Sequence, residues 1–258
     1  MTRIYGDSGR IAHVDLTNAT VVDERPDEAF NRTYAGGSAV GAYYLLKLQT
    51  RGAALLGPDN VLIFAPSVLT GAPISGLSRF TITAKSPLTG AVGDAQCGGH
   101  WGPHLKFAGF DAVVVTGRSE SPVYLWISDG RIEIRDATRL VELTTKQVEA
   151  EIRRELGDER IEVVQNGPAG RRLVRYANVC QGLHHFGGCT RMGAVMGAKN
   201  LVALAARGKR GYAFFDEAGV KAQARRAMAK YKDSPACLLS PRPGRSPSSK
   251  APTNTPLA

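Results

Sequence analysis

Residues 1–24 alternate apolar and polar positions around an Asn-Ala-Thr turn, a pattern that predicts a β-hairpin. After this hairpin, Pro26 and Asp27 open a polar stretch with helical character. Gly36 and Gly37 then form a turn, and we expect Ser38 to cap the short apolar helix that follows.

Most of the remaining apolar segments are short and continuous, as is typical of buried strands. They predict strands at 60–66, 79–86, 111–117, 123–128, 131–136, 160–165, 172–179 and 200–206, with a hairpin turn at Asp129-Gly130. A helix capped by Thr144 or Thr145 carries apolar residues at four-residue spacing and ends at Gly157. Another amphipathic helix is expected from about Asp216 to Lys232.

The segment from Asn60 to Glu120 has a later counterpart from Arg160 to Arg210. Each copy contains a strand, a glycine turn, a second strand, a glycine-rich loop, a short helix and a last strand. This repeat predicts an α+β fold, with a large mixed β-sheet domain made of two similar, duplicated halves. Two comparable glycine loops would suit a ligand with two similar halves; a purely architectural repeat is the alternative.

Composition narrows the class of ligand. The 258 residues include 29 glycines and carry a formal net charge of +10. The basic residues are spread along the chain without a nucleic-acid-binding signature, so a small phosphorylated ligand is favoured over nucleic acid, with a plain solvated surface as the alternative. The four cysteines include no CxxC pair, which argues against zinc and iron–sulfur sites. No leader pattern and no apolar run of about 20 residues is present, so a reduced cytoplasmic protein without membrane contact is expected.

The first glycine loop, GDAQCGGHWG, spans residues 93–102. Its tandem glycines allow backbone N–H groups to converge on an anion, although a tight structural turn would explain them equally well. Arg79 begins a strand and offers a fork of donors to a phosphate or a planar heterocycle; an exposed strand-end arginine is the alternative. Lys85 and Lys106 share that ambiguity.

Cys97 could serve as a metal thiolate or a nucleophile, although inert packing is the commoner role of such a cysteine. His184 and His185 are adjacent, which makes them a poor chelating pair. The chain has no nucleophile elbow, no acid pair at a fixed spacing and no cofactor-lysine motif. We therefore assign no catalytic and no metal-ligating residue from the sequence.

Several motifs together resemble the amino-terminal domain of the aldehyde:ferredoxin oxidoreductase family. They are, in the family's order, YGDSGRIAHVDLTN, AGGSAVGAYYLL, the block from SPLTGAVGDAQCGGHWG to RIEIRDA, NGPAG and GAVMGAKNL. The resemblance covers roughly residues 4–210. It implies a domain that forms the platform for a tungsten (or molybdenum) bis-pterin cofactor in enzymes that oxidise aldehydes to carboxylic acids.

The resemblance also implies site residues. It assigns the pterin-contacting arginine to Arg79. It places the first cofactor loop on Ala95, Gln96, Cys97, Gly98 and Gly99, and the second on Gly188, Cys189, Thr190 and Arg191. The sequence departs from the family pattern where Gln96 and Cys97 replace Asn and Ser. A larger departure is GCTR in place of GRGG, which deletes two glycines.

The family's further properties lie outside the segment that the resemblance covers. It implies ferredoxin and a small aldehyde as partners, a [4Fe-4S] cluster whose ligand motif is absent here, carboxy-terminal domains or a partner subunit, and a homodimer. We expect a pterin-binding domain at 1–210, the truncated start of a helical domain at 211–235 and a disordered Pro/Ser-rich tail at 236–258. An oxidoreductase fragment that is inactive alone is thus the leading interpretation, and a non-catalytic cofactor carrier or small subunit is the alternative.

Overall fold

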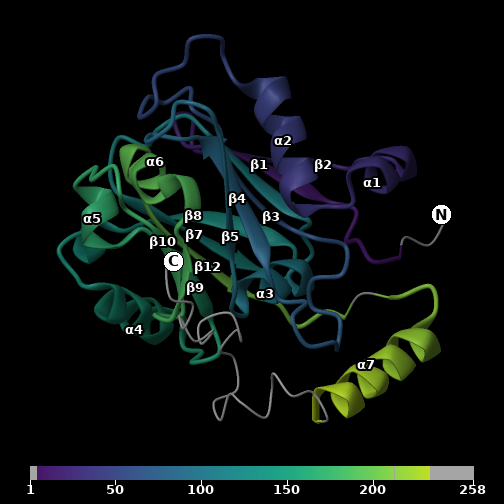
Figure 1. Ribbon diagram of the computed structural model, residues 1–258. Coiled ribbons are helices and arrows are strands. Elements are labelled where there is room, and N and C mark those ends of the chain that lie inside the picture. The colour runs from purple at the N-terminus through teal and green to yellow at the C-terminus, as the bar shows by residue number, and fades with distance from the viewer. Residues whose placement is uncertain (1–4, 212, 233–258) are drawn as a thin grey trace, which may run out of the picture. The chain divides into compact units, whose positions relative to one another are not determined.

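The computed structural model describes residues 5–211 and 213–232, which belong to two units. The first unit, residues 1–72 and 76–215, contains two six-stranded mixed sheets (Figure 1). The second unit, residues 73–75 and 216–258, contains the helix α7 (Glu217–Lys232), which confirms the helix predicted there. No described helix has the length and apolar character needed to cross a membrane. The predicted tail at 236–258, with Cys237, lies outside the described residues.

The first sheet is built from the amino-terminal half of the first unit, and the second sheet from the other half. The elements of the first half are β1 (Ile11–Asp15), β2 (Thr20–Glu24), α1 (Glu28–Tyr34), α2 (Gly37–Leu48), β3 (Leu62–Pro66), β4 (Phe80–Lys85), β5 (Val92–Cys97), α3 (Trp101–Phe107) and β6 (Ala112–Thr116). Those of the second half are β7 (Val123–Ser128), β8 (Arg131–Asp136), η1 (Thr138–Leu140), α4 (Thr145–Leu156), β9 (Glu162–Gln165), α5 (Gly167–Arg171), β10 (Val179–Gln181), β11 (His185–Gly187), η2 (Cys189–Arg191), α6 (Gly193–Ala198) and β12 (Leu201–Arg207).

Both sheets have the same strand connectivity. The first has the order β2-β1-β6-β3-β4-β5 and the second, read from its other edge, β8-β7-β12-β9-β10-β11. In each sheet the opening hairpin contributes one strand that pairs in parallel with the last strand of its half, while the other pairs are antiparallel. The predicted α+β fold with two similar halves is therefore confirmed. The repeat unit also includes the opening hairpin, which the sequence comparison left out.

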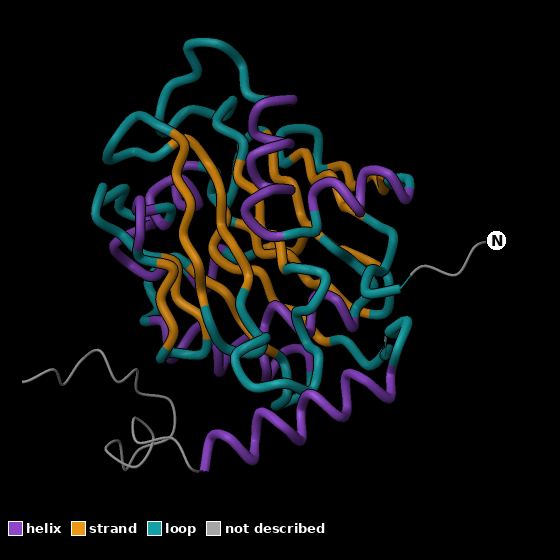
Figure 2. The backbone as a smooth tube through the Cα atoms, turned by 45° about the vertical axis from the view of Figure 1, so that its right-hand side comes forward, coloured by secondary structure: helices purple, strands orange, loops and turns teal. Residues whose placement is uncertain are grey.

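The strands of this unit form two layers with helices packed on their outer faces (Figure 2). Alternate residues of both sheets, with residues of α3 and α6, share one core between the layers, which includes Phe64, Ile82, Leu125 and Leu204. The outer face of the first sheet packs on α2, and the outer face of the second packs on α4. This burial on two faces explains why so many strands read as continuous apolar runs.

Local departures from the predicted elements have identifiable causes. Ser38 does not cap α2, because the helix already begins at Gly37 with Gly36 as its N-cap. Gly36 has φ +86°, and a Cβ there would lie 2.6 Å from the Pro66 carbonyl oxygen, so only glycine fits. The strand predicted at 172–179 is wrong except for its last residue. The chain turns there, and Leu173 has φ +58°, which no strand accommodates.

Candidate functional site: two glycine loops

Strand pairing places Arg79 and the first glycine loop side by side. In the antiparallel pair of β4 with β5, Phe80 lies opposite Cys97. Arg79 immediately precedes Phe80 and Gly98 immediately follows Cys97, so the two residues lie at the same end of the pair. The predicted loop at 93–102 is a strand up to Cys97 and turns only at Gly98.

The second half repeats this arrangement. In the pair of β10 with β11, Val179 lies opposite Gly187, and Gly188 follows. The position that matches Arg79 is therefore Asn178, and Gly188 matches Gly98. The glycine loops that the sequence placed in comparable positions thus occupy equivalent places in the two sheets.

The two loops meet at the matching residues Cys97 and Gly187. A Cβ added to Gly187 would lie 3.6 Å from the Cβ of Cys97 and 2.8 Å from Ile82 Cδ1. The Cys97 thiol is fully buried, and burial raises its pKa to about 12, although the backbone N–H groups of Gly187 and Gly98 act in the opposite direction. A fully buried thiol with a raised pKa is a poor nucleophile, and Cys97 packs between the two sheets.

The side chains of β5 alternate between the core and the outer face. Ala95 and Cys97 are fully buried between the sheets, whereas Gln96 is exposed. Of these three predicted cofactor residues, only Gln96 can present its side chain to a ligand on that outer face. Ala95 and Cys97 can contribute backbone groups alone.

Gln181 and His185 belong to the first loop's surroundings and were missed by the sequence analysis. A Cβ added to Gly99, which has φ +89°, would lie 1.3 Å from Gln181 Oε1, and one added to Gly98 would lie 3.0 Å from His185 Nδ1. Gln181 Nε2 donates to Glu162, while its buried Oε1 has no hydrogen-bond partner among the described residues. Both residues come from the hairpin of β10 with β11, whose two strands of three residues each were not predicted as a hairpin from the sequence.

The second loop is held in an unusual backbone conformation. Thr190 and Arg191 have φ values of +59° and +64°, in the left-handed region that favours glycine. The Arg191 guanidinium donates to Asn178 Oδ1 over 2.9 Å and lies 5.7 Å from the centre of the Tyr176 ring. This arginine therefore links the second loop to Asn178, the residue that matches Arg79.

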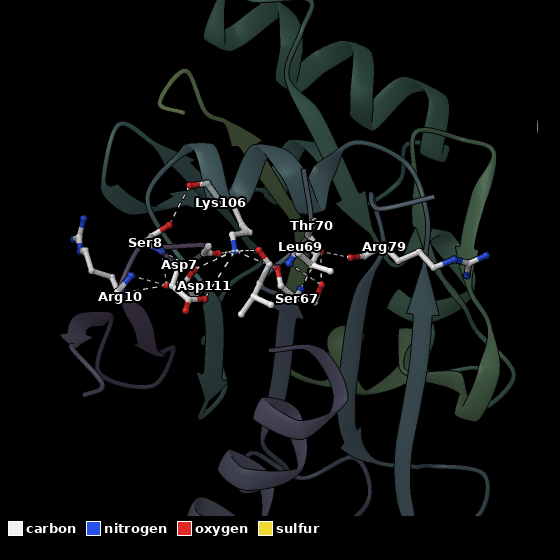
Figure 3. A network of polar contacts seen from close by, with 12 residues as sticks. Asp7, Ser8, Arg10, Ser67, Leu69, Thr70, Arg79, Lys106 and Asp111 are labelled. Atoms are coloured by element: carbon white, nitrogen blue, oxygen red, sulfur yellow. Dashed lines mark hydrogen bonds and ion pairs between the residues drawn. The ribbon is translucent and has the colours of Figure 1, made fainter. Parts of the chain in front are cut away.

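Arg79 is anchored by its backbone and exposed at its side chain. The Thr70 hydroxyl donates to the Arg79 carbonyl oxygen over 2.8 Å, and the side chain extends away from that network (Figure 3). No ion pair or hydrogen bond of its guanidinium is recorded among the described residues. The other candidates are engaged in structural contacts: Lys85 Nζ donates to the Ala53 carbonyl oxygen over 2.9 Å, and the Lys106 side chain is almost fully buried.

Exposed apolar side chains flank the two loops. Ser86, just after β4, donates to the Thr190 carbonyl oxygen over 2.9 Å and thereby links the neighbouring β4–β5 turn to the second loop. Four apolar side chains in these segments are strongly exposed: Leu88, Val92, Tyr176 and Phe186. No group of three or more His, Cys, Asp or Glu residues in the described part of the chain is arranged to hold a metal ion.

Comparison with known proteins decides the family. The family model described as aldehyde ferredoxin oxidoreductase, N-terminal domain, matches residues 11–208. The chain belongs to this family. The tungsten-containing aldehyde ferredoxin oxidoreductase of Pyrococcus furiosus is 38% identical over 232 residues, which are 90% of this chain and 38% of that protein. A WOR-like subunit of an aliphatic sulfonate oxidoreductase from the same organism is 34% identical over 226 residues.

A solved structure shows the same fold. A chain of the active site complex BamBC of benzoyl coenzyme A reductase, in complex with 1,5-dienoyl-CoA, superposes with a TM-score of 0.85 and 30% identity. The match covers 92% of this chain and 37% of that one. This family member therefore spans well under half the length of the relatives that it matches.

Proposed function

We propose that this chain is the pterin-cofactor-binding platform of an oxidoreductase that oxidises aldehydes to carboxylic acids with ferredoxin as electron acceptor. The observation that carries the proposal is the pair of equivalent glycine loops, Gly98–Gly99 and Gly187–Gly188, that meet between the two halves. A cofactor built from two pterins has the same twofold character.

The residues present fit such a group. Arg79 offers an exposed guanidinium beside the first loop, and planar, phosphorylated molecules are good partners for guanidinium. Gln181 Oε1 is a buried acceptor without a partner among the described residues, and pterins carry N–H donors. Gly98 and Gly99 leave the backbone accessible where a side chain would collide with His185 or Gln181.

In this proposal the residues of the chain bind and orient the cofactor but do not transfer protons. Arg79 and Gln96 would contact the pterin that lies on the first loop, and Gly188, Cys189, Thr190 and Arg191 would contact the second. Bound tungsten (or molybdenum) bis-pterin would supply the two-electron redox chemistry. Ala95, Cys97, Gly98 and Gly99 would contribute through their backbone.

Complete turnover would require more than this segment. The chain spans 38% of the length of the Pyrococcus furiosus relative, and the described residues offer no ligand set for a [4Fe-4S] cluster. We infer that the remaining parts of the family fold, as further domains or as a partner subunit, would provide the cluster, the aldehyde pocket and the contact with ferredoxin. The exposed apolar residues beside the loops are suited to such packing.

A non-catalytic cofactor-carrying subunit is the second candidate. The structural neighbour, a chain of the BamBC complex, supports the part of this candidate in which the chain works with partner chains. The two candidates differ in what the chain does when combined with the remaining family domains from a relative. Restored oxidation of an aldehyde would support the platform of an enzyme, whereas retained pterin without turnover would support the carrier.

The direct test measures pterin that co-purifies with the chain from a host that makes the cofactor. We expect Arg79→Ala to lower the bound pterin at least tenfold, because it removes the only charged side chain assigned to the first loop. Arg172→Ala is the matched control, since that side chain is 76% exposed and pairs only loosely with Glu142. Equal pterin content in wild type, Arg79→Ala and Arg172→Ala would contradict the proposal, as would its absence in all three.

A further inference from the structure

A recess in the first unit contains none of the glycine-loop residues. This cleft of about 670 Å³ is lined by Tyr5, Gly6, Asp7, Pro26, Asp27, Glu28, Asn31, Arg32, Ala35, Val68, Leu69, Phe214 and Phe215. These residues come from the amino-terminal segment, α1, the β3–β4 loop and the segment after β12. Its volume is typical of small-molecule sites, and such sites combine an apolar lining with a few polar groups.

Aromatic rings form one part of the lining. The rings of Tyr5 and Phe215 are packed edge to face with their centres 5.5 Å apart. Phe215 is nevertheless 86% exposed, and Leu69 in the same lining is 48% exposed. Aromatic faces attract organic cations, and exposed apolar groups of this size gather at binding sites.

Asp7 lies in the lining of this cleft and of a narrow pocket beside it that is also lined by Lys106 and Asp111. Only 12% of the Asp7 side chain is exposed, and its Oδ1 lies 4.0 Å from Lys106 Nζ. Lys106 donates its hydrogen bonds to backbone carbonyl oxygens, those of Ser67 at 3.1 Å and Val68 at 3.3 Å (Figure 3).

The two carboxylates beside Lys106 differ in how they are satisfied. Asp111 accepts hydrogen bonds from the backbone N–H groups of Ser8 and Gly9, at 2.9 and 2.7 Å. No hydrogen bond to the Asp7 carboxylate is recorded among the described residues. Burial, with a further contribution from Asp111, raises the pKa of Asp7 to about 6 although Lys106 opposes the shift. A buried carboxylate without donors is best stabilised by a ligand that brings them.

The charges around the cleft are opposite to those of the whole chain. The protein carries a net charge of +10, yet the lining holds Asp7, Asp27 and Glu28 against the single cation Arg32. Arg32 pairs with Glu28 at 2.8 Å, and Asp27 accepts the Phe30 N–H at 2.7 Å as the cap of α1. Asp7 is therefore the carboxylate in the lining that accepts no hydrogen bond from a described residue and has only the ion pair with Lys106 at 4.0 Å.

We propose that this cleft binds a small organic ammonium ion, whose charged group pairs with Asp7 and whose apolar body packs on Phe215, Tyr5 and Leu69. The site is independent of the proposed pterin site, because none of the loop residues or Arg79 lines it. Failure of either proposal therefore leaves the other untouched.

A series of probes with the same apolar body tests the charge requirement. Binding of 2-phenylethylamine, 2-phenylethanol and 3-phenylpropionate to the full chain would be measured by calorimetry at pH 8. We expect the amine to bind at least tenfold more tightly than the alcohol, and the carboxylate not to bind. Equal affinities for the three probes, or no binding of the amine, would overturn the proposal.

Two variants that each remove one negative charge distinguish a specific ion pair with Asp7 from a general effect of the charge of the lining. Asp7→Asn should weaken binding of the amine at least tenfold. Asp27 lies in the same lining and caps α1. Asn caps a helix as well as Asp, so Asp27→Asn keeps the cap and should change the affinity less than threefold. If the two variants behave alike, Asp7 has no specific role and the assignment fails. Circular dichroism of both variants checks that they are folded.

The pH dependence provides a further check. Protonation of a carboxyl with a pKa of about 6 leaves roughly a tenth of Asp7 ionised at pH 5, so amine affinity should fall about tenfold between pH 8 and pH 5. Lys106 and Asp111 are the charged groups beside Asp7, and Asp27, Glu28 and Arg32 line the same cleft. All five groups are unchanged in Asp7→Asn, so a flat profile in that variant assigns the fall in affinity to Asp7, whereas an unchanged slope would contradict the proposal.

Discussion

Thr190 and Arg191 adopt left-handed backbone conformations at the centre of the second glycine loop. Such conformations cost most residues about 1–2 kcal/mol, and a β-branched residue such as threonine is the least tolerant of them. The GRGG motif that the family resemblance implies would place glycines at these two positions. The geometry explains that preference, and it shows that the loop keeps its shape without them because Arg191 is braced on Asn178.

Thr190→Gly should therefore stabilise the protein by about 1 kcal/mol, since it removes the backbone strain while Ser86 still donates to the carbonyl oxygen of residue 190. Thermal unfolding should show a midpoint about 2–4 °C higher than that of wild type. Cys189→Gly is the control, because Cys189 does not have a positive φ. That variant should be neutral or destabilised, and an equal gain from both would refute the strain argument.

Asp7 illustrates a residue that lowers stability in the folded state. A carboxyl whose pKa is raised binds its proton more readily when folded, so the destabilisation is absent below the unfolded pKa of 3.8 and complete above about 6. Asp7→Asn should thus raise the free energy of unfolding by about 3 kcal/mol at pH 8 and leave it nearly unchanged near pH 3. Urea titrations at the two pH values measure this difference, and a pH-independent effect would show that the cause lies elsewhere.

At the scale of elements, the hairpin of β10 with β11 is locked against the first glycine loop. Gly99→Ala should destabilise the protein by more than 2 kcal/mol, because alanine must adopt φ +89° and its Cβ would collide with Gln181 Oε1. Gly52→Ala is the matched control, since Gly52 has φ +78° but no atom within 4 Å of the added Cβ, and it should cost about 1 kcal/mol.

The double variant Gly99→Ala with Gln181→Ser separates the collision from the backbone strain. Because the shorter serine clears the space, the double variant should recover most of the cost above that of Gly52→Ala. A double-mutant cycle on unfolding free energies measures the coupling, which we expect to exceed about 1 kcal/mol. Additive effects would mean that the loop and the hairpin do not touch in solution.

Elements with a strong periodic pattern could be predicted from the sequence. The opening hairpin, the turn at Asp129-Gly130 and α4 with its Thr144 cap are all present as expected. The strand β5 was missed because its alternation of small and polar residues, Gly93 to Cys97, is too short and too rich in glycine to stand out. The strand predicted after Arg172 failed because close packing of α5 on α6, where a Cβ on Gly170 would lie 2.6 Å from the Gly193 carbonyl oxygen, overrides local preference.

The candidate site could be predicted in its backbone but not in its side chains. The tandem glycines Gly98 and Gly99 are visible in the sequence and predict a loop. The apolar strand predicted at 79–86 places Arg79 at its beginning. Gln181 and His185 reach the first loop because the β10–β11 hairpin of the second sheet packs against the end of β5 in the first sheet, and such a contact between segments far apart in the chain leaves no local signal.

At the scale of the first unit, neither half buries its own sheet. The inner faces of both sheets form one core, so each half alone would expose residues such as Phe64 or Leu204 to water. Lys199 joins the halves further: its buried ammonium donates to the carbonyl oxygens of Pro58 and Gly117, both at 2.9 Å. The two halves of the first unit therefore share one topology and depend on each other for stability.

This dependence predicts the behaviour of a chain divided in the loop between β6 and β7. Fragments 1–118 and 119–232 should each lack a cooperative thermal transition, because each loses half of the shared core. Mixed together, they should regain the circular dichroism of the intact chain. Lys199→Met should weaken their association at least tenfold, since it leaves two buried carbonyl oxygens without donors across the junction.

Lys85→Met is the matched control for that experiment. Lys85 donates to the Ala53 carbonyl oxygen, and both residues lie in the first half. Loss of this hydrogen bond should lower the stability of the complex, but it removes no contact between the two fragments. Its effect on association should be smaller than that of Lys199→Met. A cooperative transition in either isolated fragment would show instead that this half folds alone and does not depend on the shared core.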